Sequence, residues 1–379
     1  MNRVKIQVLT PIHIGSGEFL KNNSDFVEYK DGGDSYISII DPKKILELIG
    51  VEHINDWVNL IERKGDTKEY VAKIGKNAAP KSYALRTITN FASSVKKEET
   101  LKECIHDGMG RAYIPGSSIK GAIRTAVLAT LSEKMNGLEN MVVTRKNEKK
   151  LVSAKQVESR LFGGDPNSDI FRFIRVGDAY FEKGCELSTR VVNLNIRERK
   201  DLKDSSKPQL VEAIGVDWKS EFQMKVDKSY YDWARNHWNF DNPKVKPLGN
   251  LPKEIQDISS LFSLINIHTG KLVKDEMDYW KEVKKAGYIG ADDYIENMES
   301  IWEEVEACKQ GMECILRIGH ASGWRFMTGA WAEKLNNFEF DVVPAARPKN
   351  FNYQQYDFPK SRRLDEDSDI FGFVKLSIL

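Results

Sequence analysis

The segment Ile114–Arg124, with the sequence IPGSSIKGAIR, combines a proline–glycine turn, two serines and two cations. Lys120 and Arg124 are four residues apart, so on a helix they lie on one face of the first turns. The free N–H groups and the positive end of the helix dipole point the same way. The pattern predicts an anion site at the start of a helix, although a capped core helix with two solvated cations has the same residues.

Small residues lie at and just after the predicted start of this helix. Gly116 ends the preceding strand, and Ser117 or Ser118 can cap the helix. Gly121 inside the helix costs roughly 0.5–1 kcal/mol relative to alanine, which indicates that a packed strand or a phosphodiester approaches it closely. The spacing of Gly116 and Gly121 is that of a Walker A loop, but Ala122 and Ile123 replace the Lys and Ser or Thr that such a loop needs. Hydrolysis of nucleoside triphosphates is therefore not predicted.

A second candidate segment follows the first predicted strand and contains His13, Gly15, Ser16 and Gly17. Two glycines one residue apart can expose successive backbone N–H groups as a nest for an anion. His13 has the chemistry of a phosphate contact or a general base. A tight turn with a histidine that only packs or hydrogen-bonds is the alternative interpretation.

A third candidate segment begins at Gly319 and continues through His320, Gly323, Trp324 and Arg325. Backbone that a ligand can approach, an aromatic ring for base stacking and a guanidinium for phosphate are typical of single-stranded RNA recognition. The alternative is a hairpin in which Trp324 and the phenylalanine two residues later fill the core. For the rings of Trp324 and Phe326, the sequence predicts a core position and an RNA contact equally.

The elements around these segments predict an α+β fold. Strands are expected at Val4–Val8, Tyr36–Ile40, Phe171–Tyr180, Arg190–Ile196, Glu221–Val226, Met312–Ile318 and Phe371–Ile378, and a helix at Ile119–Met135. The expected domains are residues 1–185, with a helical insertion at about 43–104, and residues 186–379, with one at about 253–310. Asp201–Pro208 is polar and is expected to form an exposed loop.

Composition narrows the class of protein. The 379 residues carry 57 Lys plus Arg and 56 Asp plus Glu, a formal net charge of +1, so only a local basic groove, not the whole surface, is expected to attract nucleic acid. No apolar run reaches the roughly 18 residues of a membrane span, and the N-terminal stretch lacks the apolar core of a signal peptide. The four cysteines are unclustered, so neither a structural zinc site nor another metal is expected, and the chain is expected in the cytoplasm.

The strand, the glycine turn, the GSSIKGAIR helix and the late glycine-rich loop occur together and in order, and this combination resembles the RAMP superfamily of CRISPR proteins. The late GWRFMTG segment, followed by Pro359–Arg362 and the final strand, is similar to the subunit at the crRNA 3′ end of type III-A effector complexes. The resemblance covers both ends and the centre of the chain and little of the helical insertions.

The resemblance implies two ferredoxin-like, RNA-recognition-type sandwich domains without a cofactor. It implies a non-catalytic subunit that binds the 3′ part of the crRNA and supports its maturation in antiviral defence. The implied partners are crRNA, a repeated backbone RAMP subunit, a small helical subunit, a large signalling subunit and host trimming nucleases. The residues expected to contact RNA are His13, Gly15, Ser16, Gly17, Gly116, Ser117, Ser118, Lys120, Gly121, Arg124, Gly319, His320, Gly323, Trp324 and Arg325.

Two other functions remain open at this point. Backbone subunits of this class cut target RNA with an acidic residue after the first glycine turn, but Asp25, Asp31 and Asp34 give no clear match to that motif. A RAMP endoribonuclease that processes the crRNA would need a base and an acid near one phosphate, and His13 and His320 are the pair to consider. A small-molecule phosphate-binding enzyme is the third hypothesis.

Overall fold

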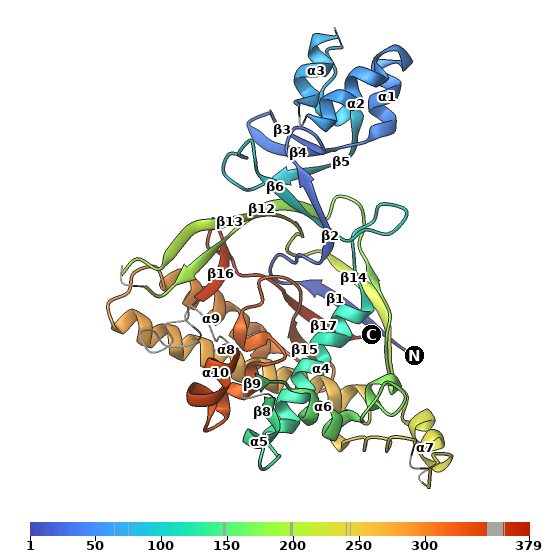
Figure 1. Cartoon of the computed structure of the whole chain (residues 1–379), viewed down its shortest axis with the longest axis vertical. Helices are drawn as coiled ribbons and strands as arrows, with labels where there is room; N and C mark the ends of the chain where they lie inside the picture. Colours follow the sequence, from blue (N-terminus) through green and yellow to red (C-terminus); the bar gives the residue numbers. More distant parts are fainter. Residues whose placement is uncertain are drawn as a thin grey trace.

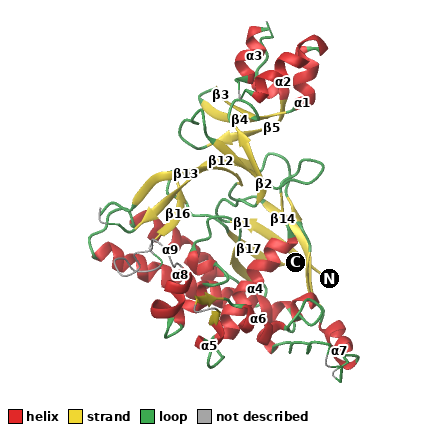
Figure 2. Cartoon of the chain, viewed as in Figure 1, coloured by secondary structure: helices red, strands yellow, loops and turns green. Residues whose placement is uncertain are grey.

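The chain is built around two β-sheets with helices packed against them (Figure 1). The computed structural model describes residues 1–63, 65–74, 76–146, 149–197, 200–239, 241–242, 244–346, 359 and 361–379. Helices gather below the central strands, and a separate group of helices stands at the opposite end of the molecule (Figure 2). The predicted α+β class is confirmed.

The first sheet has five strands and contains the two ends of the chain. Its order is β10 (Ile174–Val176), β14 (Lys219–Val226), β1 (Asn2–Val8), β17 (Phe373–Ile378) and β15 (Glu313–Arg317), and every neighbouring pair is antiparallel. Val4, Ile6 and Val8 of β1 are buried, as the alternation of apolar and polar residues predicted. β1 therefore lies at the centre of the sheet, hydrogen-bonded on both edges.

Two long helices pack together beside this sheet, α4 (Gly116–Ser132) and α8 (Ile258–Lys285). The predicted apolar stripe of α4 is confirmed: Ile119, Ile123, Ala126 and Val127 are buried. Asp257 starts α8 by accepting a hydrogen bond from the Ser260 N–H at 2.8 Å. A further helix, α9 (Asp292–Ala307), packs against α8, so the two helices occupy most of residues 253–310.

The second sheet is larger and mixed. Its order is β2 (Gly15–Lys21), β6 (Thr100–Cys104), β13 (Lys203–Ile214), β12 (Glu186–Asn195), β5 (Ala84–Asn90), β4 (Asp34–Ile40) and β3 (Phe26–Asp31), with β16 (Ser361–Asp365) also paired to β12. The prediction that Asp201–Pro208 forms an exposed loop is wrong. Lys203–Ile214 is one strand, and Asp204 pairs with Asn193 across the ladder, so the polar residues there are exposed strand residues.

The helical insertion in the first half is shorter than expected. Its helices are α1 (Pro42–Ile49), α2 (Ile54–Glu62) and α3 (Thr67–Lys73), and strands β5 and β6 occupy residues 84–90 and 100–104, where helix was expected. The helices pack against β3 and β4 around a small core that includes Ile45, Trp57, Val71, Val27 and Ile40. They form the separate group at the far end of the molecule (Figure 1).

Strands from both halves of the sequence are interleaved in both sheets. β1 lies between β14 and β17, and β5 and β6 pair with β12 and β13. The boundary expected between residues 185 and 186 therefore does not separate the two sheets. One consequence is that the two termini lie side by side (Figure 1).

Short elements complete the described chain. The strand expected at Phe171–Tyr180 is divided into a helical turn, Ile170–Phe173, and the strands β10 and β11. The remaining elements are β7 (Tyr113–Ile114), α5 (Glu139–Val142), β8 (Val143–Lys146), β9 (Lys149–Val152), α6 (Lys155–Phe162), β11 (Ala179–Tyr180), α7 (Lys228–Asn236) and α10 (Val343–Ala346).

Candidate nucleic-acid interface

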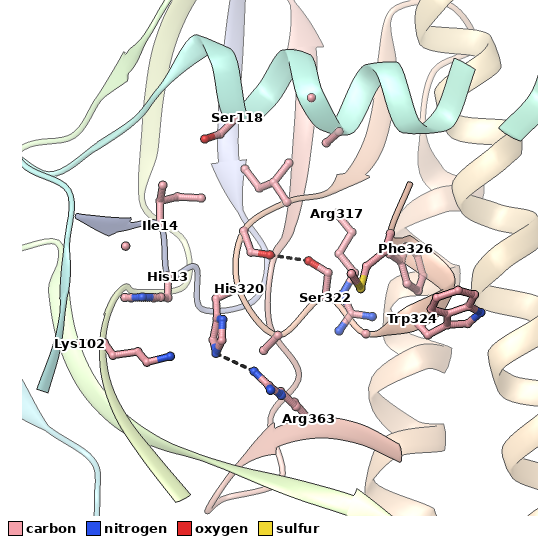
Figure 3. A pocket seen from close by; sticks show the side chains of 18 of the residues that line it. His13, Ile14, Lys102, Ser118, Arg317, His320, Ser322, Trp324, Phe326 and Arg363 are labelled. Carbon is pink, nitrogen blue, oxygen red and sulfur yellow. Dashed lines mark hydrogen bonds between the residues drawn. The ribbon is translucent and has the colours of Figure 1, made fainter. Parts of the chain in front are cut away.

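The three glycine-rich segments meet at one open cleft of about 1150 Å³. Its walls are the turn between β1 and β2, the first turns of α4, the loop after β15, and strands β6 and β16 (Figure 3). Of the residues expected to contact RNA, those that line the cleft are His13, Gly15, Gly17, Ser118, Gly121, Gly319, His320, Gly323 and Trp324. Ser16, Gly116, Ser117, Lys120, Arg124 and Arg325 are outside it.

His13 and His320 lie edge to face in this cleft, with their ring centroids 5.6 Å apart. His13 is buried, and its Nδ1 donates to the Glu212 carbonyl oxygen at 2.6 Å. Burial lowers the pKa of His13. Burial also lowers the pKa of His320 to about 4, helped by the positive charges of Arg363 and Lys102. Both imidazoles are therefore neutral near pH 7.

Glycine allows the two loops that carry these histidines to touch. The N–H of His320 donates to the carbonyl oxygen of His13 at 2.9 Å. A Cβ on Gly319, whose φ is +81°, would lie 2.7 Å from that oxygen. A Cβ on Gly15 would lie 3.1 Å from Nε2 of His13. The glycines after each strand thus bring the loop walls together and leave Gly17 in the open part of the cleft.

Two cations outside the three glycine-rich segments also line the cleft, Lys102 on β6 and Arg363 on β16. Arg363 Nη1 donates to Nε2 of His320 at 2.9 Å (Figure 3), and Lys102 Nζ donates to Oε1 of Gln209 at 2.9 Å. In the part of the chain that the structure describes, neither forms an ion pair with a carboxylate. Burial lowers the pKa of Lys102, and the charge of Arg363 lowers it further. An anion placed between the two cations would relieve this repulsion.

A signal for Arg363 was present in the sequence as the Arg362–Arg363 doublet. On a strand, neighbouring side chains point to opposite sides. Both arginines line the cleft, but Arg362 is held in a buried ion pair with Glu276, whereas Arg363 has no such partner among the described residues. Lys102 was missed because its strand was expected to be helix, which hides the alternation of side chains. The nearby carboxylate of Glu103 is already paired with Arg86 at 3.0 Å.

The anion site expected at the start of α4 is not arranged as predicted. The residue before the helix is Pro115, and neither Ser117 nor Ser118 caps it. The Gly116 N–H donates to Oδ1 of Asp178 at 2.7 Å, so a carboxylate of the chain already occupies the helix end. A Cβ on Gly116 would lie 2.3 Å from the Val176 carbonyl oxygen, which gives this glycine a packing role.

Arg124 is engaged inside the protein instead of facing an anion. Its guanidinium pairs with Asp169 at 2.8 Å and Glu158 at 3.1 Å, and it lies 4.3 Å from the centroid of the Phe162 ring. Arg124 and Lys120 line a separate hollow of about 760 Å³ on the other side of α4. Gly121 borders both spaces, and a Cβ on it would meet no atom within 4 Å. The bare backbone at Gly121 therefore faces open space.

Arg325 also points away from the cleft. It pairs with Glu276 and Glu333, each at 3.1 Å, and its guanidinium lies 4.9 Å from the Tyr279 ring centroid. Trp324 lines the cleft and packs against the main core, while Phe326 lies edge to face with Phe373. Both aromatic rings thus combine a core contact with a place in the cleft wall.

The described residues contain no group of three or more His, Cys, Asp or Glu side chains arranged to hold a metal ion. No helix among them is both long and apolar enough to span a bilayer. The cleft is lined by cations, imidazoles, exposed backbone and the carboxylates of Glu18 and Glu103.

Comparison with known proteins agrees with this fold. The chain matches the RAMP superfamily over residues 5–324, and it belongs to that superfamily. It is 29% identical over 205 residues to the CRISPR system Cms protein Csm5 of Methanocaldococcus jannaschii, which covers 52% of this chain and 47% of that protein. It is 24% identical over 262 residues to Csm5 of Enterococcus italicus, covering 61% of each. The chain thus spans about half to three fifths of these relatives.

Two solved structures share the fold over nearly the whole chain. The crystal structure of T. onnurineus Csm5 is similar with a TM-score of 0.64 and 20% identity, covering 99% of this chain and 100% of that one. A chain in the cryo-EM structure of a Csm–crRNA–target RNA ternary complex of a type III-A CRISPR–Cas system is similar with a TM-score of 0.64 and 20% identity, covering 100% of both chains.

Proposed function

We propose that this chain is a non-catalytic RNA-binding subunit of a type III-A CRISPR ribonucleoprotein, and that it holds the 3′ part of the crRNA in the cleft. The observation that carries the proposal is the pair Lys102 and Arg363, which form no ion pair with a carboxylate in the described chain and line the same cleft as Gly15, Gly17 and other glycines. Cations and open N–H groups hold a phosphodiester backbone without reading its sequence.

Its relatives and fold support the proposed partners. A chain of similar fold lies in a Csm–crRNA–target RNA complex. The partners we propose are crRNA, a repeated backbone RAMP subunit, a small helical subunit and host trimming nucleases, in the cytoplasm. A bound cap sets the end of a guide without cutting it, because it blocks a trimming exonuclease or recruits one.

We further propose that the first sheet is a ferredoxin-like unit. The order β10–β14–β1–β17, with α4 after β1 and α8 after β14, is that of a split βαβ sandwich. This unit draws on both halves of the chain. It differs from the expectation of two such domains that follow one another in sequence.

The endoribonuclease alternative gains one observation, since His13 and His320 do lie together. Their protonation argues against it. Nδ1 of His13 donates to a carbonyl, and Nε2 of His320 accepts from Arg363, which leaves only Nε2 of His13 as a candidate base. Lowered pKa values leave neither ring as a proton donor near pH 7.

The test is incubation of the purified chain with labelled single-stranded guide RNA, once in EDTA and once in Mg²⁺. Stoichiometric binding without new bands is the expected result. Specific cleavage that is lost in His13→Ala would establish the endoribonuclease instead. Absence of RNA binding would contradict both and favour the third hypothesis, a small-molecule phosphate-binding enzyme.

A further inference from the structure

Phe19 places an exposed phenyl ring at the rim of the cleft. It lies on β2, lines the cleft and is 55% exposed. Trp324 and Phe326 also line the cleft, but they pack against the two larger hydrophobic clusters. Among the described residues that line the cleft, Phe19 is therefore the aromatic ring most available to a ligand.

The fold does not account for the position of this ring. Leu20, the next residue, packs against the cluster that contains Phe26 and Leu101, but Phe19 belongs to none of the hydrophobic clusters. Single exposed apolar side chains are common on protein surfaces, so exposure alone would carry no conclusion. Among the described residues, Phe19 differs from the other exposed phenyl groups in having a cation beside its ring.

Lys102 is the cross-strand partner of Phe19 in the pairing of β2 with β6. Its Nζ lies 5.7 Å from the centroid of the phenyl ring and is fixed by Gln209. The positive charge of Arg363 also acts on Lys102, and Arg363 contacts His320. An aromatic ring and two cations from strands of one sheet thus line the same cleft.

We propose that Phe19 stacks on a nucleobase of the bound strand while Lys102 holds the adjacent phosphate. The inference rests on the proposed function and adds a base-stacking position to it. Proteins that bind single strands without reading sequence alternate aromatic rings with cations in this way, because every base offers a π face. The chemical class recognised here is therefore one unpaired nucleotide, with little preference among bases.

The experiment measures binding of the full chain to a short oligouridylate by fluorescence anisotropy over a range of salt concentrations. Phe19→Ala is expected to weaken binding by about 5- to 150-fold without changing the slope of log affinity against log salt. Phe19→Trp is expected to restore the affinity. The control variant is Phe91→Ala, which removes another phenyl group that is 55% exposed but lines a different hollow, and it should bind as the wild type does.

A second readout reports stacking directly. Oligouridylates that carry 2-aminopurine at each position in turn should show one position whose fluorescence the wild type quenches and Phe19→Ala does not. If Phe19→Ala binds like the wild type while Lys102→Ala is weakened, the stacking proposal is wrong and the proposed function stands. Equal weakening by Phe19→Ala and Phe91→Ala also overturns it. If the wild-type chain binds no RNA, both proposals fall.

Discussion

Glu276 on α8 and Arg362 on β16 form a buried two-point ion pair, in which Arg362 Nε and Nη2 each lie 2.5 Å from a carboxylate oxygen. Arg325 pairs with the same carboxylate at 3.1 Å, and the Tyr294 hydroxyl donates to it at 2.6 Å. Burial alone would raise the pKa of Glu276, but the two guanidinium groups lower it to about 2. One carboxylate thus joins α8 to the loop and the strand that form two walls of the cleft.

Glu276→Gln should lower the free energy of unfolding by about 3–5 kcal/mol, because it leaves buried guanidinium groups without their counter-charge. Chemical denaturation measures the change. Glu282→Gln, on the exposed face of the same helix, is the control and should stay within about 1 kcal/mol of the wild type. A Glu276→Gln protein as stable as that control would contradict the structural role given to this carboxylate and to Arg325.

Two glycine substitutions on α4 should have opposite effects. Gly121→Ala should stabilise the free protein by about 0.5–1 kcal/mol, since a Cβ there meets open space and alanine favours the helix. It should weaken RNA binding if the strand crosses the bare backbone. Gly116→Ala should destabilise the protein, because its Cβ would press on the Val176 carbonyl. Unfolding midpoints and RNA titrations of both variants test this pair. If Gly121→Ala binds RNA as tightly as the wild type, Gly121 does not contact the RNA.

Lys102→Ala and Arg363→Ala should each make the dependence of log affinity on log salt shallower by about 0.7, the value for one phosphate contact on a single strand. Arg124→Ala is the contrasting variant. It should lose roughly 1–2 kcal/mol of stability through its ion pairs with Glu158 and Asp169 and leave the slope unchanged. If Arg124→Ala made the salt dependence shallower while Lys102→Ala and Arg363→Ala did not, the anion site would lie at the start of α4 instead.

The stability of the protein should fall as the pH is lowered from about 6.5 to 4, in part through His320. The pKa of His320 is about 4 in the folded protein against 6.5 for an ordinary histidine. Between these values the unfolded chain binds more protons, so acid favours unfolding. Between pH 6.5 and 4, a His320→Gln variant should lose less unfolding free energy than the wild type does. The difference should be on the order of 1–2 kcal/mol, after allowance for solvent screening. Asp365, whose pKa burial raises to about 6, has the opposite effect, because its folded state binds more protons than its unfolded state as the pH falls. It is present in both proteins, so the difference between their pH profiles of stability reports His320. Identical pH profiles would show that His320 titrates normally.

Guide maturation gives a test in the cell. Deletion of the gene should leave longer, unevenly trimmed guides and fewer complete complexes, because no cap defines the 3′ end. His13→Ala and His320→Ala should each leave guide length unchanged wherever RNA binding persists. Sequencing of guides from purified complexes measures both. Untrimmed guides in normally assembled complexes of either histidine variant would support the endoribonuclease.

The sequence predicted the elements whose periodicity is local and regular. Val4–Val8 alternates cleanly, and the apolar stripe of α4 repeats at helical spacing, so both were found. Lys203–Ile214 was missed because its first half is polar on an exposed part of the sheet, where burial imposes no alternation. The pairing of β1 with β17 depends on contacts between residues far apart in the chain, which local patterns do not reveal.

The same limit applies to the site. The glycines could be recognised as places of close approach, and the segments that contain them do converge. The direction in which each cation points was not predictable. Arg124 and Arg325 look like ligands in sequence, but carboxylates from other elements neutralise them, whereas Arg363 has no such partner among the described residues. Those carboxylates come from α6, α8 and the ends of two short helical turns, and helical or strand spacing along the sequence does not connect them to the arginines.

The position of β1 between β14 and β17 has a consequence for the order of events during synthesis. Val4 pairs with Ile378, so β1 cannot complete its hydrogen bonding until β17 has left the ribosome. At about 5–20 residues per second, that delay lasts on the order of tens of seconds. Until then the edge of β1 that pairs with β17 has no hydrogen-bond partners from that strand. A nascent chain thus carries an unpaired strand edge, the kind of edge to which strands of other chains can add.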